Sequence, residues 1–321
     1  MKYVRTGGTG GLDVSALCLG ALRFGSMTDE ATAFAILDRF LDAGGTFIDT
    51  ANTYAFWVDG CTGEESENLI GRWMAGRGVR DRVVLATKAG ALPDPLDAPW
   101  PEKAEGLAPE VMRRQTEAAL RRLGTDRIDV FYSHIEDRRT PVHEQVAGLG
   151  SLVADGKVRV LGASNHTAWR IEQARVAARE LSVAGYSCIQ QRYTYLQPRP
   201  GVDFGVNPHA SDELLDYVSS EPDELTLLGY STLLSGAYGR DDRPVPAEYD
   251  HPGTAARLAA VRAVAAETGA TPNQVVLAWL LGGSPSVLPV IGVSSVAQLE
   301  ECLAAVDLKL DAEHRTLLDA A

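Results

Sequence analysis

The sequence predicts an α/β fold: a (β/α)8 TIM barrel with a short N-terminal β-hairpin and long loops at the carboxyl ends of its strands. Short apolar runs alternate eight times with longer amphipathic stretches along the 321 residues, which favours a parallel sheet. Eight such units allow the sheet to close on itself. An open, doubly wound sheet is the alternative. We expect one barrel domain over residues 1–321, since barrels of more than ~250 residues commonly form a single domain.

The chain begins with a predicted hairpin over residues 1–15, in which Gly7, Gly8, Gly10 and Gly11 supply the turn. These glycines do not form a dinucleotide-binding loop, because the third glycine of Gly-x-Gly-x-x-Gly is missing and no helix pattern follows. The apolar runs after the hairpin are the expected barrel strands, at residues 17–19, 47–48, 83–86, 128–131, 158–161, 188–189, 225–228 and 287–291.

Helix signals stand between these runs. Thr28-Asp29-Glu30 offers a cap and an acidic first turn, and Thr140-Pro141 places proline at a first helical position. Two apolar stripes with helical spacing end at Gly124 and just before Gly269. Glycine is the residue type that most often ends a helix, so both stripes predict helices that stop at these positions. A capping box begins at Thr271, and a last helix is expected near residues 311–319.

Four long segments rich in Pro, Gly, Asp and aromatic residues follow predicted strands, at residues 54–63, 89–107, 193–208 and 238–253. All four leave the carboxyl ends of strands. In a barrel these ends form the catalytic face, where loops shape the pocket.

Composition narrows the classes of partner. A net charge of −13 disfavours nucleic acid or an anionic membrane, whose binding surfaces need an excess of Lys and Arg. No run of about 18 apolar residues predicts a membrane helix, and the N-terminus lacks an apolar signal segment. The four cysteines are scattered without a Cys-x-x-Cys pair, which favours a reducing, cytoplasmic setting. A small molecule is therefore the expected partner, and the oligomeric state stays open.

Groups that donate, accept or ionise stand where the apolar runs stop. Because the carboxyl ends of parallel strands share one rim, these side chains are expected to ring a single mouth. Each alone has an ordinary explanation, as a helix cap, a solvated charge or a packed ring, but together they indicate a catalytic bowl. The residues are Asp49, Lys88, His134, Ser164, Asn165, Gln190, Tyr230 and Ser231.

A tyrosine beside a lysine suggests proton transfer. A free phenol has a pKa of about 10, and a neighbouring ammonium lowers that pKa by favouring the phenolate. We therefore expect Lys88, held by Asp49, to lower the pKa of Tyr54, which then protonates a carbonyl oxygen as hydride arrives. His134 would hydrogen-bond the same oxygen. The set contains no zinc constellation, Gly-x-Ser-x-Gly elbow or Cys–His pair, so no metal is expected.

A family resemblance follows from these motifs. Residues 47–54, Phe-Ile-Asp-Thr-Ala-Asn-Thr-Tyr, followed by Ala86-Thr87-Lys88 and His134, resemble the tetrad of the aldo-keto reductases. Further segments resemble the family in the same order along nearly the whole chain. They are the opening hairpin and first strand over 1–21, Gly162-Ala163-Ser164-Asn165, Gln190-Gln191-Arg192-Tyr193, Tyr230-Ser231-Thr232-Leu233 with Thr232 replacing a proline, and the turn at Gly292.

The resemblance implies a reductase of aldehydes or ketones that uses NADP(H). It implies Tyr54 as the acid, Lys88 and Asp49 as its tuning pair, and His134 as the group that orients the carbonyl. It also implies an extended cofactor whose nicotinamide ring stacks on Tyr230. The other cofactor-binding residues that it implies are Gly20, Ala21, Leu22, Ser164, Asn165, Gln190, Ser231, Leu233, Gly292, Ser294, Gln298 and Glu301.

One departure concerns the 2′-phosphate of NADP. Many family members place Lys or Arg after the eighth strand, but no basic residue lies between Arg262 and Lys309 here. Ser294, Ser295 and the N-terminus of a helix expected from Val296 are weaker ligands for an anion than a guanidinium. NADP(H) is favoured and NAD(H) stays open. Cys302 also replaces an Asn that is usual near the adenine.

Aromatic residues on the mouth loops are candidates for a substrate pocket, chiefly Trp57, Trp100 and Tyr193. An aromatic bowl suits sugar rings, aromatic aldehydes and polycyclic ketones equally. Some barrels of this family serve as potassium-channel β subunits, so a nucleotide-binding regulatory barrel with little turnover is the alternative function. A metal-dependent hydrolase or a phosphate-sugar isomerase is a third reading, but the sequence shows neither the metal cluster nor the phosphate loop that these need.

Overall fold

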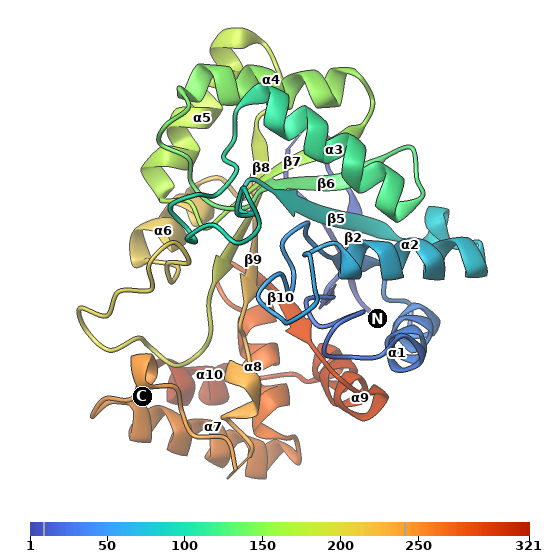
Figure 1. The fold of residues 1–321 in the computed structure, drawn as a ribbon. Coiled ribbons are helices and arrows are strands. Elements are labelled where there is room, and N and C mark those ends of the chain that lie inside the picture. Colours follow the sequence, from blue (N-terminus) through green and yellow to red (C-terminus); the bar gives the residue numbers. More distant parts are fainter. Residues whose placement is uncertain (9, 241) are drawn as a thin grey trace.

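The computed structural model describes residues 1–8, 10–240 and 242–321, and within them eight parallel strands close into a barrel (Figure 1). The strand order is β10-β3-β4-β5-β6-β7-β8-β9, so the predicted barrel is confirmed and the open sheet is wrong. Each strand overlaps one of the predicted apolar runs. The strands are β3 (Cys18–Gly20), β4 (Phe47–Asp49), β5 (Val84–Ala89), β6 (Ile128–Ser133), β7 (Val158–Ser164), β8 (Tyr186–Arg192), β9 (Thr226–Tyr230) and β10 (Val287–Gly292).

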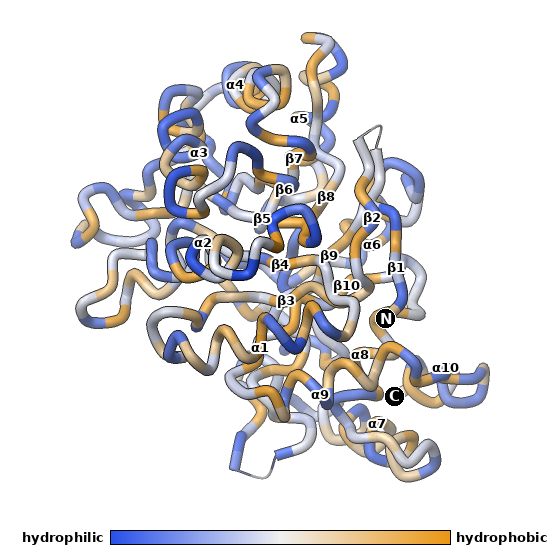
Figure 2. The backbone as a smooth tube through the Cα atoms, turned by 90° about the vertical axis from the view of Figure 1, so that its right-hand side faces the viewer, coloured by the Kyte–Doolittle hydropathy of each residue, from blue (hydrophilic) through white to orange (hydrophobic). Residues whose placement is uncertain are grey.

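The helices lie outside the barrel (Figure 1), and hydrophobic and hydrophilic residues alternate along them (Figure 2). This alternation lets the helices bury one side in the hydrophobic core and leave the other to water. The helices are α1 (Glu30–Asp42), α2 (Glu65–Arg77), α3 (Pro109–Leu123), α4 (Val142–Ala154), α5 (Ala168–Leu181), α6 (Asp212–Ser220), α7 (Thr254–Thr268), α8 (Pro272–Leu281), α9 (Val296–Ala304) and α10 (Ala312–Asp319).

Most helix ends follow the predicted signals. The Asp29 carboxylate caps α1, Gly124 and Gly269 end α3 and α7 in the left-handed conformation, and Thr271 forms the capping box of α8. The prediction for α4 is wrong by one residue. Pro141 has a ψ of 138°, which lies outside the helix, so α4 begins at Val142 and the proline precedes it.

The N-terminal hairpin closes the end of the barrel opposite the mouth. As predicted, β1 (Tyr3–Arg5) and β2 (Asp13–Ser15) pair antiparallel. Leu12 and Val14 pack in the same buried cluster as the strand residues inside the barrel. The Gly7 amide donates to Thr226 Oγ1 at the start of β9 (2.7 Å), which places the hairpin at the amino ends of the strands.

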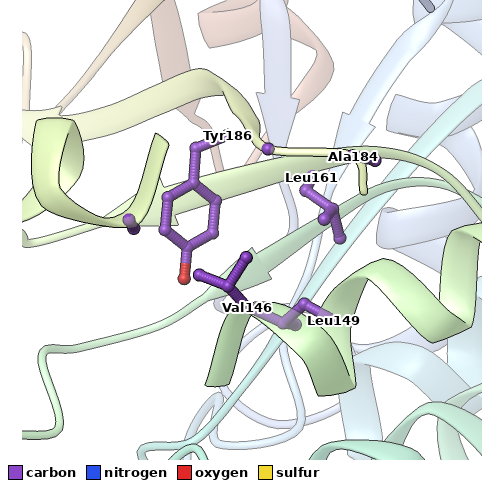
Figure 3. Close-up of a pocket in the computed structure, with 7 residues that line it drawn as sticks. Val146, Leu149, Leu161, Ala184 and Tyr186 are labelled. Atoms are coloured by element: carbon purple, nitrogen blue, oxygen red, sulfur yellow. The ribbon is translucent and has the colours of Figure 1, made fainter. Parts of the chain in front are cut away.

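A small apolar void lies between the helix layer and the barrel wall, away from the mouth (Figure 3). It has a volume of about 10 Å³, enough for one water at most. Val146 and Leu149 of α4, Leu161 of β7 and Tyr186 of β8 line it, so it is a packing gap and not a substrate site. None of the helices in the described part of the chain has the length and apolar character that a membrane crossing requires.

Candidate active site

Strand register brings the predicted polar groups to one rim. Ser164 of β7 lies beside Gln190 of β8, and Lys88 of β5 lies beside Tyr132 of β6. His134 directly follows β6, and its backbone amide donates to Ala89 O at the end of β5 (2.9 Å). Because parallel strands end at a common edge, residues far apart along the chain meet at this mouth.

Lys88 lies at the centre of the site and is 1% exposed. Its ammonium donates to Asp49 Oδ2 (2.5 Å), to the Thr50 carbonyl oxygen (2.9 Å) and to Tyr54 Oη (2.7 Å). These three bonds use all three donors of an ammonium group. The buried charge is therefore compensated by a carboxylate and by full hydrogen bonding, as a charge in this position requires.

Tyr54 reaches the same point from the loop after β4. The Thr50 amide donates to Ala86 O and the Asn52 amide to Lys88 O, so the chain continues along β5 before it turns. The Tyr54 hydroxyl donates to Asp49 Oδ2 (2.8 Å) while it accepts from Lys88 Nζ. The structure therefore brings together the predicted acid, its ammonium and its carboxylate.

The pKa of Tyr54 differs in direction from the sequence-based expectation. Burial and the charge of Asp49 hold the pKa of the phenol well above its usual value. Burial also lowers the pKa of Lys88, although Asp49 opposes that shift. The sequence predicted a lowered pKa from the Lys88 ammonium alone. In the structure the Asp49 carboxylate accepts a hydrogen bond from the same hydroxyl, and this bond favours the neutral phenol.

His134 stands beside Tyr54, with ring centroids 6.1 Å apart. Its Nδ1 is hydrogen-bonded to Thr53 Oγ1 (3.1 Å), and its carbonyl oxygen accepts from Asn165 Nδ2 (3.0 Å). Burial, and then the charge of Lys88, hold the pKa of this imidazole well below its usual value. The ring is therefore neutral near pH 7. In the tautomer that carries its proton on Nε2, Nδ1 accepts from the Thr53 hydroxyl and Nε2 is a donor at the mouth.

Side chains suited to a carboxamide lie beside Asp49 and His134 at the mouth. Gln190 Nε2 donates to Asp49 Oδ1 (2.9 Å), and Asn165 Nδ2 donates to Ser164 Oγ (3.2 Å). The Tyr230 hydroxyl donates to Asn165 Oδ1 (2.7 Å), which fixes its ring across the rim. Amide and hydroxyl groups complement the two donors and one acceptor of a carboxamide, so this donor set fits a nicotinamide beside the Tyr230 ring.

The first and last barrel strands place further predicted residues together. Gly20 of β3 pairs with Gly292 of β10, and the Ala21 amide donates to Asp49 O (2.8 Å). Leu22 is exposed at the rim. Gly20 has little space for a side chain, since a Cβ there would come within 3.0 Å of Val290.

The residues predicted for the adenosine end lie on and before α9. The Ser294 amide and hydroxyl both donate to Gln298 Oε1 (2.8 and 3.1 Å), and Ser295 caps the helix. Glu301 Oε1 accepts from Thr271 (2.6 Å) and Asn273 (3.2 Å), so its carboxylate is held against α8. No basic side chain lies on this segment. Arg39 of α1 reaches α9, where it pairs with Glu300.

The predicted substrate-pocket aromatics divide into two groups. Trp57 is 57% exposed, and Trp100 is partly exposed with Nε1 donating to Ala91 O (2.9 Å). Phe56 lies near both, with centroid distances of 5.3 Å to Trp57 and 6.2 Å to Trp100. Tyr193 is instead buried and stacks on Trp279. Its contribution to a pocket stays a prediction.

Two polar residues of this region escaped the sequence analysis. Thr53 contacts the His134 ring, and its place next to Tyr54 was the signal that could have revealed it. Glu105 accepts from Asn52 Nδ2 (2.9 Å) and the Gly90 amide (2.8 Å), and so ties the loop after β5 to the segment before Tyr54. Burial raises the pKa of Glu105. The loop sequence around Glu105 does not indicate these contacts, because Asn52 and Gly90 lie far from Glu105 along the chain.

Comparisons with known proteins match nearly the whole chain to one family of oxidoreductases. The family model described as the aldo/keto reductase family matches residues 16–321. An uncharacterised oxidoreductase of Bacillus subtilis is 36% identical, over 99% of this chain and 95% of that protein. A norsolorinic acid reductase of Emericella nidulans is 35% identical, and an aryl-alcohol dehydrogenase of Pestalotiopsis microspora is 32% identical. Each of these two matches covers 94% of this chain and 77% of the relative.

Proposed function

Because the chain belongs to the aldo/keto reductase family, we propose that it reduces an aldehyde or a ketone to an alcohol by hydride transfer from NADPH, with Tyr54 as the general acid. The observation that carries the proposal is the contact between the Tyr54 hydroxyl, the Lys88 ammonium and the Asp49 carboxylate at the barrel mouth. The relatives described above are named as oxidoreductases, a reductase and a dehydrogenase, which supports the same class of reaction.

The residues at the mouth supply the proton. The bound nicotinamide, when present, supplies the hydride to the carbonyl carbon. The carbonyl oxygen then gains an electron pair and takes the proton of Tyr54 Oη, while His134 Nε2 donates a hydrogen bond to the same oxygen. The raised pKa of Tyr54 keeps the phenol protonated near neutral pH. Lys88 Nζ, at 2.7 Å from the phenol oxygen, stabilises the phenolate that remains until water returns the proton.

For the cofactor we propose NADP(H) in preference to NAD(H). The Ser295 hydroxyl and the first turn of α9 offer hydrogen bonds to a 2′-phosphate, and the Ser294 hydroxyl can do so when it leaves Gln298 Oε1. Against this preference, Arg39 is the cation that reaches α9, and Glu300 already pairs with it. A direct comparison of the two cofactors therefore belongs in the test.

For the substrate we propose an aromatic aldehyde or ketone. Phe56, Trp57 and Trp100 form an accessible aromatic group on the loops after β4 and β5, and the first two follow Tyr54 closely along the chain. Flat rings stack well on such a surface. One relative is named as an aryl-alcohol dehydrogenase, which agrees with this class. We also propose a cytoplasmic location, since Cys18, Cys61, Cys188 and Cys302 are free thiols.

The test combines turnover with binding. We expect the purified protein to oxidise NADPH in the presence of 4-nitrobenzaldehyde, followed by the loss of absorbance of the reduced cofactor. Tyr54→Phe should lower kcat by about 10² to 10⁴, because it removes the acid and little else. Titration of tryptophan fluorescence should show unchanged affinity for NADPH in this variant, since the phenol hydroxyl is not a predicted cofactor ligand.

Tyr3→Phe is the control, because it removes a hydroxyl on the exposed hairpin far from the mouth. Turnover that survives in Tyr54→Phe would exclude Tyr54 as the acid. Binding of NADPH by the wild type without any turnover would favour the regulatory alternative. Binding of NADH at least tenfold more tightly than NADPH, about 1.4 kcal/mol, would overturn the choice of NADP(H).

A further inference from the structure

A guanidinium group lies behind the Tyr230 ring. Arg192 ends β8 two residues after Gln190, so its side chain leaves the same face of the strand. Its guanidinium carbon lies 5.5 Å from the centroid of Tyr230 and 5.0 Å from that of Phe204, over both rings. Nε donates to Asn207 O (3.2 Å), which holds the group in this position.

This charge has no carboxylate partner among the ion pairs of the described residues. Asp203 and Glu248 line the same pocket of about 440 Å³, yet neither pairs with Arg192. Asp203 Oδ1 instead accepts from the Gly205 amide (2.7 Å). Arginine stays protonated at any pH at which the protein is folded. A positive charge with no contacting counterion therefore stands next to Tyr230.

The position of Tyr230 connects this charge to the chemistry. Its hydroxyl is tied to Asn165, which is tied in turn to the His134 carbonyl, so the ring cannot turn freely. In the proposed function this ring is the surface on which the nicotinamide stacks. The inference takes the nicotinamide to stack on the face of Tyr230 that Arg192 does not cover. A stacking distance of ~3.5 Å added to the 5.5 Å between the guanidinium and the Tyr230 centroid would then separate the two charges by roughly 9 Å.

The two redox forms of the cofactor differ at that ring by one unit of charge. The oxidised nicotinamide is a pyridinium cation, and the reduced one is neutral. We propose that Arg192 makes this site discriminate against the oxidised cofactor, by repelling the pyridinium and by drawing the electrons of the Tyr230 ring away from it. This inference rests on the proposed function. Arg192 acts through Tyr230 and is a positioning residue, with no contact to the reacting atoms.

The consequence is preferential occupation of the site by the reduced cofactor. Weak binding of the oxidised form speeds release of the spent cofactor and lessens its competition with NADPH, while the overall equilibrium of the reaction stays the same. Two unit charges roughly 9 Å apart at an effective dielectric of about 20 to 40 give about a five- to twenty-fold change in relative affinity. The phosphates are identical in both forms, so any attraction between them and Arg192 cancels from the ratio of the two dissociation constants.

The experiment measures that ratio. We would titrate the wild type, Arg192→Met, Arg192→Gln and Arg192→Lys with NADP⁺ and with NADPH, by tryptophan fluorescence and by calorimetry, without substrate. In both neutral variants the Kd of NADP⁺ divided by the Kd of NADPH should fall about five- to twenty-fold below the wild-type value. Arg192→Lys keeps the charge and should keep the ratio. Gln also keeps a donor for Asn207 O, so it guards against a folding defect in the Met variant.

The outcomes separate this inference from the proposed function. If the wild type binds neither form of either dinucleotide, the proposed function fails and the inference falls with it. If the wild type binds both forms and the neutral variants weaken both equally, Arg192 has only a structural or phosphate-binding role and the inference is wrong. A lowered ratio in Arg192→Lys as large as that in Arg192→Met would also overturn it, because the charge would then not be the cause.

Discussion

At the scale of single residues, the orientation of His134 depends on a neighbour that carries no charge. Thr53 Oγ1 lies 3.1 Å from His134 Nδ1 and comes from the residue just before the proposed acid. The lowered pKa of the imidazole means that one nitrogen carries the proton and the other accepts. When the Thr53 hydroxyl donates to Nδ1, it favours the tautomer with the proton on Nε2, and it comes from the same stretch of loop as the acid.

We expect Thr53→Val to lower kcat/KM by about tenfold, because the valine keeps the shape but cannot donate, and one hydrogen bond contributes roughly 1 to 1.5 kcal/mol. Binding of NADPH should not change. Thr53→Ser is the matched control and should retain activity, since it keeps the hydroxyl. Steady-state kinetics with 4-nitrobenzaldehyde measures the effect. Equal activity in the Val and Ser variants would show that the tautomer is set by another group.

At the scale of elements, one row of the barrel supports the site from below. Lys88 on β5, Tyr132 on β6 and Gly162 on β7 lie side by side in the register. The Lys88 ammonium lies over the Tyr132 ring, 5.7 Å from its centroid. A Cβ at Gly162 would come within 2.4 Å of that ring. The glycine therefore makes room for the aromatic that packs under the ammonium.

Gly162→Ala should lower the free energy of unfolding by roughly 1 to 3 kcal/mol through overpacking, and should lower kcat by moving the Tyr132 ring against Lys88. A second change, Tyr132→Leu, should restore part of the stability by making space.

Gly76→Ala is the control, because Gly76 is an exposed residue of α2 with nothing within 4 Å of a new Cβ. That change should stabilise by roughly 0.5 to 1 kcal/mol. Urea unfolding measures all of these, and neutral behaviour of Gly162→Ala would contradict the packing argument.

At the scale of the whole molecule, one buried and two half-buried histidines contribute to the response to acid. His134, His166 and His209 all have pKa values below the usual value for histidine, chiefly because of burial, and the pKa of His209 falls to about 4. A depressed pKa in the folded state means that unfolding takes up protons at low pH. The stability that these rings contribute is thus present above about pH 6.5, the unfolded value, and is lost as the pH falls.

Between pH 7 and pH 5.5 we expect the His209 ring, with its pKa of about 4, to remove roughly 1 kcal/mol from the free energy of unfolding, and the other two rings to act in the same direction. Glu67 and Glu105 act in the opposite direction, because their pKa values are raised, but only as the pH approaches their own range. His209→Phe should flatten the pH dependence by about one proton. Urea midpoints of His209→Phe and of the wild type across this pH range would decide, and an equal slope in the two proteins would refute the assignment.

The sequence alone determined the barrel and the place of the site. Alternating patterns and capping residues define strands and helices locally, and the rule that parallel strands end at one rim then placed Asp49, Lys88 and His134 together before any coordinates. The tertiary structure decided what depends on the environment of a side chain. It reversed the expected pKa shift of Tyr54, because the phenol is buried and also donates to Asp49.

The dependence on a side chain's surroundings also explains the other features that the sequence did not show. Tyr193 is buried against Trp279, and Arg192 lies over the Tyr230 ring. In the sequence, both residues belong to a segment that resembles a family motif, and nothing in that motif indicates these contacts. Glu105 holds the segment before Tyr54 through partners far away along the chain. Periodicity records which side of an element is buried. Desolvation, ring contacts and charge pairs depend on which distant segments meet, and the closed barrel alone settles that.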